Sequence, residues 1–120
     1  MDIQKKIAEM KRDPEFSRNV GMILVHNGVV RGWSKNEKLP VARLEVQANP
    51  EKIESLRMEY ESKPGIYKIL VEAKSGILLP GDDLLFIIVA GDLRVNVKQV
   101  FGDLLDRIKS EAVTKVEHQN

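Results

Sequence analysis

Cationic side chains are the groups in this 120-residue sequence that could do chemistry, and they stand at the ends of expected elements. Arg31 follows the apolar run that ends in Val30, and Arg94 follows the break "AGD". Lys109 and Lys115 lie six residues apart near the C-terminus. Arginine binds phosphate or carboxylate oxygens through a planar fork, and lysine supplies a mobile point charge. These residue types indicate a site for an anion.

Each cation also has a structural interpretation. Arg94 begins a helix whose free N–H groups attract anions, but it could instead pair with Asp92 or with Asp82-Asp83. Lys109 stands in the last turn of that helix, where a lysine stabilises the helix dipole. The two residues are fifteen positions apart, or roughly 22 Å along an α-helix. One small ligand in one chain cannot contact both, so a shared site needs a second copy or an extended ligand.

The sequence offers few residues for other kinds of functional site. Cysteine is absent, which excludes disulfides, thiolate nucleophiles and zinc–thiolate sites. His26 and His118 have no metal-ligand partner at suitable spacing, so we expect no metal and no cofactor, and His26 is expected to be a packed strand residue. Asp82-Asp83 follows Pro-Gly and is expected to form a turn rather than bind a cation. Nucleophile elbows, phosphate-binding loops and dinucleotide-binding glycine motifs are also missing.

Composition describes an ordinary globular protein, 42% hydrophobic and 31% charged. Nineteen basic against eighteen acidic side chains give no field that would gather nucleic acid. The longest apolar run, "LLFIIVA", is too short to cross a membrane, and the first residues are amphipathic. We therefore expect a cytoplasmic protein without nucleic-acid or membrane partners. Residues 1–120 should form one domain, with an N-terminal helix in 1–13 and a C-terminal site segment and tail in 111–120.

Elements expected in the N-terminal half position Val30 and Arg31. The stretch "VGMILVHNGVVRGW" is either a strand pair turning at Asn27-Gly28 or one long strand with a bulge there. A polar loop, "SKNEKLP", follows, and "ARLEVQA" alternates as a strand. Asn49-Pro50 then starts a helix, with Asn49 as its cap, and Pro64-Gly65 ends it.

Elements expected in the C-terminal half position the remaining cations. "IYKILVEA" is a strand with Tyr67, Ile69, Val71 and Ala73 inward, "LPGDD" is a turn, and "LLFIIVA" is the most buried strand. Apolar residues then keep helical spacing from Leu93 to Lys109. This order predicts an α+β fold, a mostly antiparallel sheet with packed helices on one face.

With these residues in view, the chain resembles the large, catalytic subunit of molybdopterin synthase (MoaE-like) from about Gly21 to Glu117. The stretches that carry the resemblance are "GVVRGWS", "LEVQANPEKIESL", "GILLPGDDLLFIIVAGDLR" and "LLDRIKSEAVTKVE". Within them, Arg94, the Asp-x-x-Lys ending at Lys109 and the Lys-x-Glu of Lys115 and Glu117 follow the family order. These residues, taken together in this order along the chain, indicate the family more specifically than any one of them does.

The resemblance implies an α/β-hammerhead-type α+β fold and a homodimer. It also implies a small ubiquitin-like sulfur-carrier subunit, whose Gly-Gly tail ends in a thiocarboxylate and inserts into the large subunit. The implied reaction is a sulfurtransferase reaction: two sulfurs pass to a cyclic pyranopterin monophosphate, giving molybdopterin for molybdenum cofactor biosynthesis. The assembled enzyme would be a heterotetramer.

The resemblance also assigns roles to residues of this sequence. Lys109 and Lys115 are the expected catalytic residues, and the substrate-binding residues are expected to be Val30, Arg31, Arg94 and Glu117. Leu93 stands where the family usually has histidine, and Thr114 stands where it has tryptophan. These differences motivate an alternative: a homologue that keeps the fold and the dimer but acts as a non-catalytic binding or regulatory module.

Overall fold

The computed structural model describes residues 1–120 as an elongated molecule of 51 × 25 × 24 Å. The strands are β1 (Met22–Val29), β2 (Arg43–Ala48), β3 (Ile66–Ala73), β4 (Gly76–Leu78), β5 (Asp83–Gly91) and β6 (Val113–His118). The helices are α1 (Ile3–Lys11), α2 (Phe16–Asn19), α3 (Pro50–Glu61) and α4 (Arg94–Arg107), and a π-helical turn, η1 (Ile108–Ala112), continues α4. None of these helices has the length and apolar composition needed to cross a bilayer.

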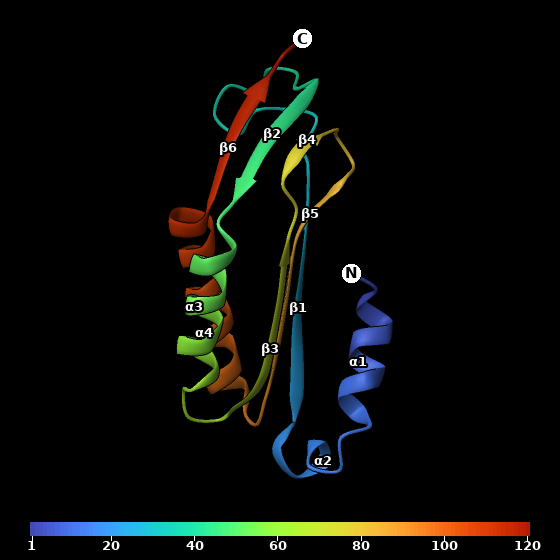
Figure 1. The fold of residues 1–120 in the computed structure, drawn as a ribbon, viewed down its shortest axis with the longest axis vertical. Coiled ribbons are helices and arrows are strands. Elements are labelled where there is room, and N and C mark those ends of the chain that lie inside the picture. The colour runs from blue at the N-terminus through green and yellow to red at the C-terminus, as the bar shows by residue number, and fades with distance from the viewer.

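The strands form two separate three-stranded sheets, both antiparallel, with the orders β1-β5-β3 and β4-β2-β6. Figure 1 shows the first sheet along the long axis, between α1 and the pair α3 and α4, and the second sheet toward the C-terminus. This is the α+β, mostly antiparallel architecture that the sequence predicts. The prediction of one sheet was wrong, because β2 and β6 pair beyond the helices and take only the short β4 as their third strand.

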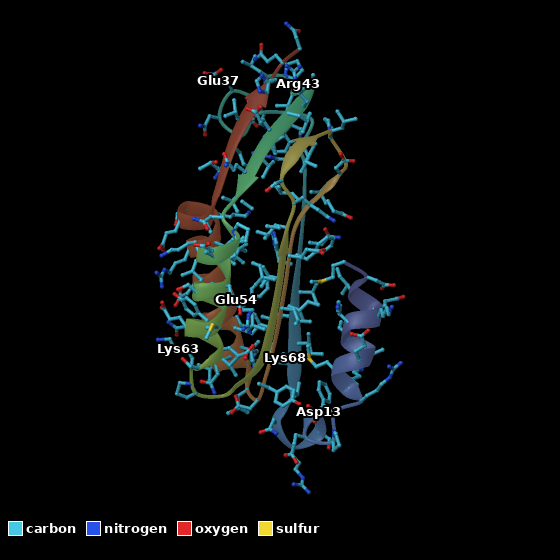
Figure 2. All side chains as sticks on the ribbon, viewed as in Figure 1. Asp13, Glu37, Arg43, Glu54, Lys63 and Lys68 are labelled. Carbon is cyan, nitrogen blue, oxygen red and sulfur yellow. The ribbon has the colours of Figure 1, made fainter.

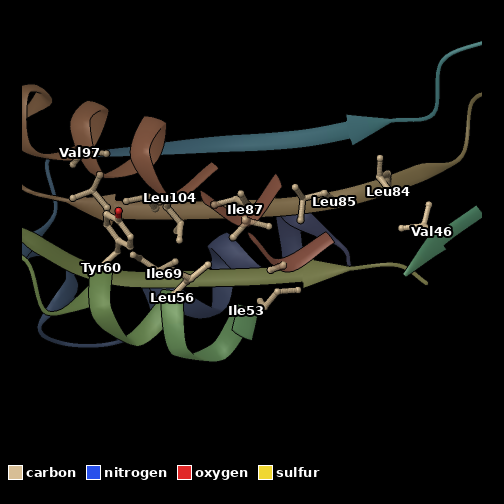
Figure 3. Close-up of a cluster of buried hydrophobic side chains, with 14 of the residues drawn as sticks. Val46, Ile53, Leu56, Tyr60, Ile69, Leu84, Leu85, Ile87, Val97 and Leu104 are labelled. Atoms are coloured by element: carbon tan, nitrogen blue, oxygen red, sulfur yellow. The ribbon is translucent and has the colours of Figure 1, made fainter. Parts of the chain in front are cut away.

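The central strand β5 is buried on both faces, as its wholly apolar sequence predicts. One face packs under α3 and α4, where Leu56, Ile69, Ile87 and Leu104 belong to the main core (Figure 3). The other face, including Ile88, packs against Met10 of α1. The expectation of helices on one face was therefore wrong. An amphipathic pattern shows that α1 has an apolar stripe, but it does not say which face of the sheet receives that stripe.

Charged side chains stay at the surface, and every buried residue is hydrophobic. In Figure 2 the labelled side chains of Glu54 and Lys63 project from the helical layer, and that of Asp13 lies at the end next to α2. The ionisable groups with functional potential are consequently found at edges and pocket mouths, where the core stops.

Strand β1 is continuous, so of the two alternatives for "VGMILVHNGVVRGW" the long strand is confirmed and the tight turn is wrong. Asn27 and Gly28 pair with Phe86 and Leu85 of β5, and the register shifts only between Gly28 and Val29. The shift is a bulge near the end of the strand. It lies just before the site residues Val30 and Arg31.

Strand β3 also contains a bulge, between Ile66 and Lys68. The prediction that Tyr67 shares a face with Ile69 was wrong because the extra residue breaks the two-residue alternation. Tyr67 instead lies on the α1–α2 side, with its ring 6.2 Å from that of Phe16 in an edge-to-face contact. Ile69 is fully buried in the main core, as expected.

The start of α3 follows ordinary capping chemistry, whereas α4 begins without a side-chain cap. Asn49 caps α3 by accepting a hydrogen bond from the backbone N–H of Lys52 at 3.1 Å, with Pro50 in the first turn. The last predicted helix begins at Arg94 and is α-helical to Arg107. It then widens into η1, in which Ile108 and Ala112 are buried. Lys109 therefore lies in the π-helical turn that ends this helical segment.

Candidate functional site

A pocket of about 270 Å³ opens where the ends of β1, β2, β5 and β6 meet. Its lining residues are Val29, Val30, Arg31, Leu44, Leu84, Lys115 and Glu117. Four of the six site residues expected from the sequence, Val30, Arg31, Lys115 and Glu117, thus come together from two segments about 85 residues apart in the chain. The apolar wall formed by Val29, Leu44 and Leu84 was not expected as part of the site. Strand alternation could have indicated it only if the pairing of β2 with β6 were known.

Neighbouring residues fix the position of the Arg31 side chain. Val30 is buried, only 4% exposed. Its backbone exchanges hydrogen bonds of 2.9 Å with the Pro80–Asp82 turn: its N–H donates to the Asp82 carbonyl, and the Gly81 N–H donates to the Val30 carbonyl. Gly81 has φ +94°, a conformation that glycine adopts without strain. The next residue, Arg31, is exposed, and its guanidinium carbon lies 4.8 Å from the centroid of the Trp33 ring. The turn and the indole ring hold the cation at the pocket.

Asp82, the first residue of the Asp82-Asp83 pair, has a structural role in the turn at Pro80–Asp82. Asp82 accepts a hydrogen bond from the backbone N–H of Leu79 through its carboxylate at 2.8 Å. The predicted turn is confirmed for Asp82, whose N–H donates to the Leu79 carbonyl, whereas Asp83 is the first residue of β5. No group of three or more histidine, cysteine, aspartate or glutamate side chains is placed to hold a metal ion.

Lys115 and Glu117 reach the pocket on β6, opposite Val46 and Leu44 of β2. Two residues apart on one strand, they point to the same side of the sheet. Lys115 is exposed as a whole residue. Desolvation by the surrounding protein and then the positive charges of Lys109 and Arg31 nevertheless lower the pKa of its ammonium, while Glu117 opposes the shift. A lysine in such surroundings loses its proton more readily than a free surface lysine.

Lys109 does not line the pocket but lies beside it. Its positive charge lowers the pKa of both Lys115 and His26. Because such effects weaken with distance, the three groups share one neighbourhood. Lys109 makes no ion pair with any carboxylate. Its charge is therefore left to act toward the pocket, while Lys109 also stands in the last turn of the helical segment, as the sequence leads one to expect.

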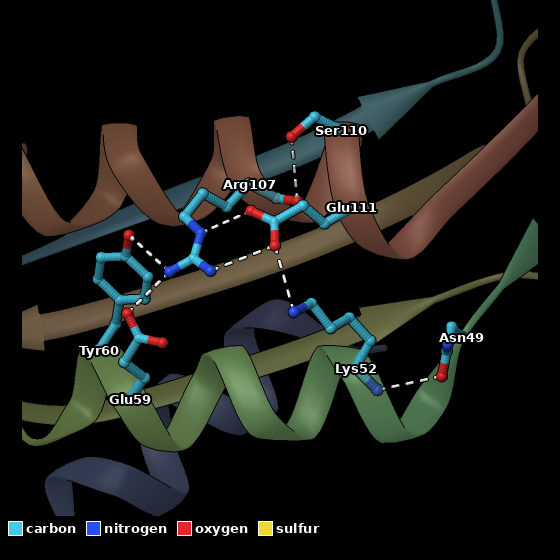
Figure 4. Close-up of polar contacts among 7 residues, drawn as sticks. All are labelled: Asn49, Lys52, Glu59, Tyr60, Arg107, Ser110 and Glu111. Atoms are coloured by element: carbon cyan, nitrogen blue, oxygen red, sulfur yellow. Dashed lines mark hydrogen bonds and ion pairs between the residues drawn. The ribbon is translucent and has the colours of Figure 1, made fainter.

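An ion-pair network fixes the segment that carries Lys109. Arg107 bonds Glu111 at 2.6 Å and Glu59 of α3 at 2.7 Å, and Lys52 of α3 lies 3.2 Å from Glu111 (Figure 4). The Arg107 and Lys52 contacts lower the pKa of Glu111 to about 2. We call this set, with Tyr60, the α3–η1 clamp. It ties the π-helical turn to a second helix and so positions Lys109 and the start of β6.

Arg94 lies elsewhere. It borders a separate surface depression on α4 together with Lys98, Gln99 and Asp106. The Asp92 carboxylate accepts hydrogen bonds from Leu93 and Asn96, and Arg94 pairs neither with Asp92 nor with Asp82-Asp83. Leu93 is 62% exposed at the helix start. Within one chain Arg94 does not join the pocket, as its spacing from Lys109 predicts.

His26 is a neighbour of the site that sequence reasoning interpreted only as a packed strand residue. It lies on the β1 face that packs under α4, opposite Ile87. Its Nε2 atom is buried and has no hydrogen-bond partner. Nothing in the spacing of His26, Lys109 and Lys115 along the chain could have indicated that they approach one another.

Residues 1–111 match the family described as MoaE protein. This chain belongs to the MoaE family. A curated relative from Haloferax volcanii, described as "Probable molybdopterin synthase", is 24% identical over 113 residues. The match covers 91% of this chain but 43% of the relative, so the chain spans less than half the length of that protein.

Solved structures agree with the family assignment. Molybdopterin synthase from Staphylococcus aureus has a TM-score of 0.72 and 25% identity, covering 84% of this chain and 76% of that chain. Molybdopterin cofactor biosynthesis protein E from Burkholderia multivorans has a TM-score of 0.73 and 22% identity, covering 100% and 86%. A complex of subunits 1 and 2 of molybdopterin-converting factor from Helicobacter pylori has a TM-score of 0.70 and 16% identity, covering 100% and 82%. The last two show that the MoaE fold is shared.

Proposed function

We propose that this chain is the large subunit of a molybdopterin synthase. It would transfer sulfur from a thiocarboxylated small subunit to a cyclic pyranopterin monophosphate. The observation that carries the proposal is the convergence of Arg31, Lys115 and Glu117 on one pocket, with Lys109 beside it, in a chain of the MoaE family. A cationic pocket with an apolar wall suits a substrate that combines a phosphate with a flat ring system.

Arg31, Lys109 and Lys115 have different roles, which follow from the chemistry of each side chain. Arg31, held by Val30 and Trp33, offers a directional fork to phosphate oxygens. The charge of Lys109 stabilises the oxyanion that develops when the thiocarboxylate carbonyl is attacked. Lys115, whose pKa is lowered, is the better candidate to lose its proton and attack the acyl carbon. That attack forms an amide with the tail and expels its sulfur as sulfide toward the pterin; hydrolysis of the amide by water then frees Lys115 and leaves the tail as a carboxylate.

The partners follow from the same site. A second copy of the chain would supply Arg94, which lies too far from the pocket within one chain. A small ubiquitin-like protein would insert its Gly-Gly tail, as the presence of two subunits in the Helicobacter pylori complex suggests. We propose a homodimer with one small subunit at each site, a heterotetramer, and residues 1–120 acting as a single domain.

The test is conversion of the pyranopterin by the purified chain, with a thiocarboxylated small subunit as the sulfur source. Lys109→Ala and Lys115→Ala should each lower the rate about 100-fold or more, since each removes charge stabilisation or a nucleophile from the transition state. Lys11→Ala is the matched control, because Lys11 is an exposed lysine of α1 without an ion pair. Equal rates for all three variants would refute the assignment of the two lysines.

One observation favours the alternative of a binding or regulatory module. Leu93 is an exposed leucine at the start of α4, where the resemblance leads one to expect histidine. Tight binding of the Gly-Gly-tailed protein without pterin turnover would support this alternative. Turnover that depends on Lys115 would exclude it.

A further inference from the structure

His26 lies on β1, three residues before the pocket residue Val29. It pairs with Ile87 of β5, and its side chain faces the main core beneath α4. Two residues on, a Cβ at Gly28 would come within 2.8 Å of the His26 Nε2 atom. The imidazole therefore leans along β1 over Gly28, where only the missing side chain leaves room for it.

The Nε2 atom of this imidazole is buried and unpartnered. Buried polar atoms without hydrogen bonds are uncommon because each one forfeits its contacts with water. One explanation for such an atom is a partner that arrives only when the site is occupied. The groups near His26 suggest which partner that is.

The charged groups that act on His26 are two lysines. The positive charges that act on His26 belong to Lys109 of η1 and Lys115 of β6, whereas β5 presents the apolar residues Ile87 and Leu85. Burial first, and then these two positive charges, lower the pKa of the imidazole. At neutral pH the ring is therefore uncharged, with a lone pair on one nitrogen. A lone pair at Nε2 would be free to accept a hydrogen bond from an ammonium donor.

Lys109 is the donor best suited to this lone pair. Neither lysine makes an ion pair, but the charge of Glu117 acts on Lys115 from the same strand. In an empty pocket the two ammonium groups repel each other. An anion that binds between them removes this penalty and lets both approach the imidazole.

We propose that His26 is a positioning residue of the pocket: when an anion binds, its neutral Nε2 accepts a hydrogen bond from the Lys109 ammonium and holds that charge on the ligand. The inference deepens the proposed function, on which it rests for the anionic nature of the ligand. It assigns to His26 a role that family membership does not give it. No proton is transferred in this step, because the imidazole acts only as an acceptor.

The first test is NMR of the full chain with ¹⁵N-labelled histidine, using inorganic phosphate as the anion. The chain has two histidines, so His118→Gln assigns the signals. We expect the Nδ1–H tautomer of His26 and a shift of its Nε2 signal on adding phosphate. Lys109→Ala should abolish that shift. An Nε2–H tautomer, no shift at saturating phosphate, or a full shift in Lys109→Ala would each overturn the proposal.

The second test compares phosphate affinities. His26→Phe removes the acceptor but keeps a flat ring, and should weaken binding about 3- to 10-fold, as expected for one lost hydrogen bond. His26→Gln restores an acceptor oxygen and should bind within about twofold of wild type. Equal losses in both variants would mean a purely packing role and would contradict the proposal. Gly28→Ala leaves the imidazole intact but displaces it, and should reproduce the loss seen in His26→Phe.

The outcomes separate this inference from the proposed function. A normal phosphate response of His26 in a protein that cannot convert the pyranopterin would refute the function alone. Full turnover by His26→Phe, with unchanged phosphate affinity, would refute the role of His26 alone.

Discussion

Lys115 combines two properties that rarely coincide: it is accessible to solvent, and it lies beside two other cations. Its lowered pKa has desolvation as the leading cause, with Lys109 and Arg31 adding their charges. Lys115 therefore loses its proton at a lower pH than an ordinary lysine does, and its exposed side chain can still reach a ligand. Glu117 on the same face of β6 moderates the effect.

This environment predicts selective reactivity. Because the amine form is the nucleophile, Lys115 should be acylated by an amine-reactive reagent at lower pH than Lys11, the exposed α1 lysine that serves as the control. Peptide mass spectrometry across a pH series measures the two profiles in one sample. Lys109→Met should move the Lys115 profile toward higher pH, since it removes a repelling charge. If Lys115 and Lys11 of the wild type were acylated over the same pH range, the lowered pKa of Lys115 would be contradicted.

Elements, rather than single residues, bring these side chains together. The resemblance supplied the site residues by number, and the alternation of β2 and the Asn49 cap were readable from residue types. Three features were not: the bulge that turns Tyr67 to the α1–α2 side, the widening of α4 into η1, and the approach of His26 to Lys109. Each depends on contacts between segments distant in the chain, which local periodicity does not record.

The α3–η1 clamp predicts a pH-dependent contribution to stability. The pKa of Glu111 is lowered to about 2 in the folded chain. The stabilisation is therefore present above the ordinary glutamate pKa and is lost as the pH falls from about 5 toward 2. Urea unfolding of Glu111→Gln should show a lower midpoint than wild type at pH 7, and the difference should shrink at low pH. A midpoint difference that stays constant down to pH 3 would contradict this assignment.

A matched variant separates the clamp from a generic salt bridge. Glu54→Gln breaks a pair with Arg57 that lies within α3 and joins no second element. It should change the urea midpoint less than Glu111→Gln does, because exposed pairs within one helix contribute little.

The cap of α3 gives a second prediction at the scale of elements. Asn49→Ala removes the side-chain acceptor for the Lys52 N–H and should lower the free energy of unfolding by about 1 kcal/mol. Urea denaturation at neutral pH measures this loss. A change below about 0.3 kcal/mol, well under the usual value for a cap, would mean that Asn49 does not act as one.

At the scale of the whole molecule, the elongated shape keeps the Arg94 surface apart from the pocket at the junction of the sheets. Figure 1 shows α4 running beside the first sheet toward the second, so its first turn lies at the opposite end from β6. A homodimer that sets one copy's helix start against the other copy's pocket would complete two equivalent sites.

This arrangement predicts complementation between inactive variants. Arg94→Ala and Lys115→Ala should each be nearly inactive alone. After subunit exchange, half of the dimers are mixed, and one of their two sites is intact. About one quarter of wild-type activity should then return, given random pairing in a two-fold symmetric dimer. No recovery, when exchange is verified by mass spectrometry, would show that one chain builds the whole site.

Sulfur transfer by this chain can be tested by counting the sulfur atoms in the product. The purified chain, the thiocarboxylated small subunit and the cyclic pyranopterin monophosphate are mixed, and both the pterin product and the small subunit are weighed by mass spectrometry. We predict a product that carries two sulfurs and two small subunits converted to carboxylate for each product formed. Binding of both reactants without any sulfur-bearing pterin would contradict it.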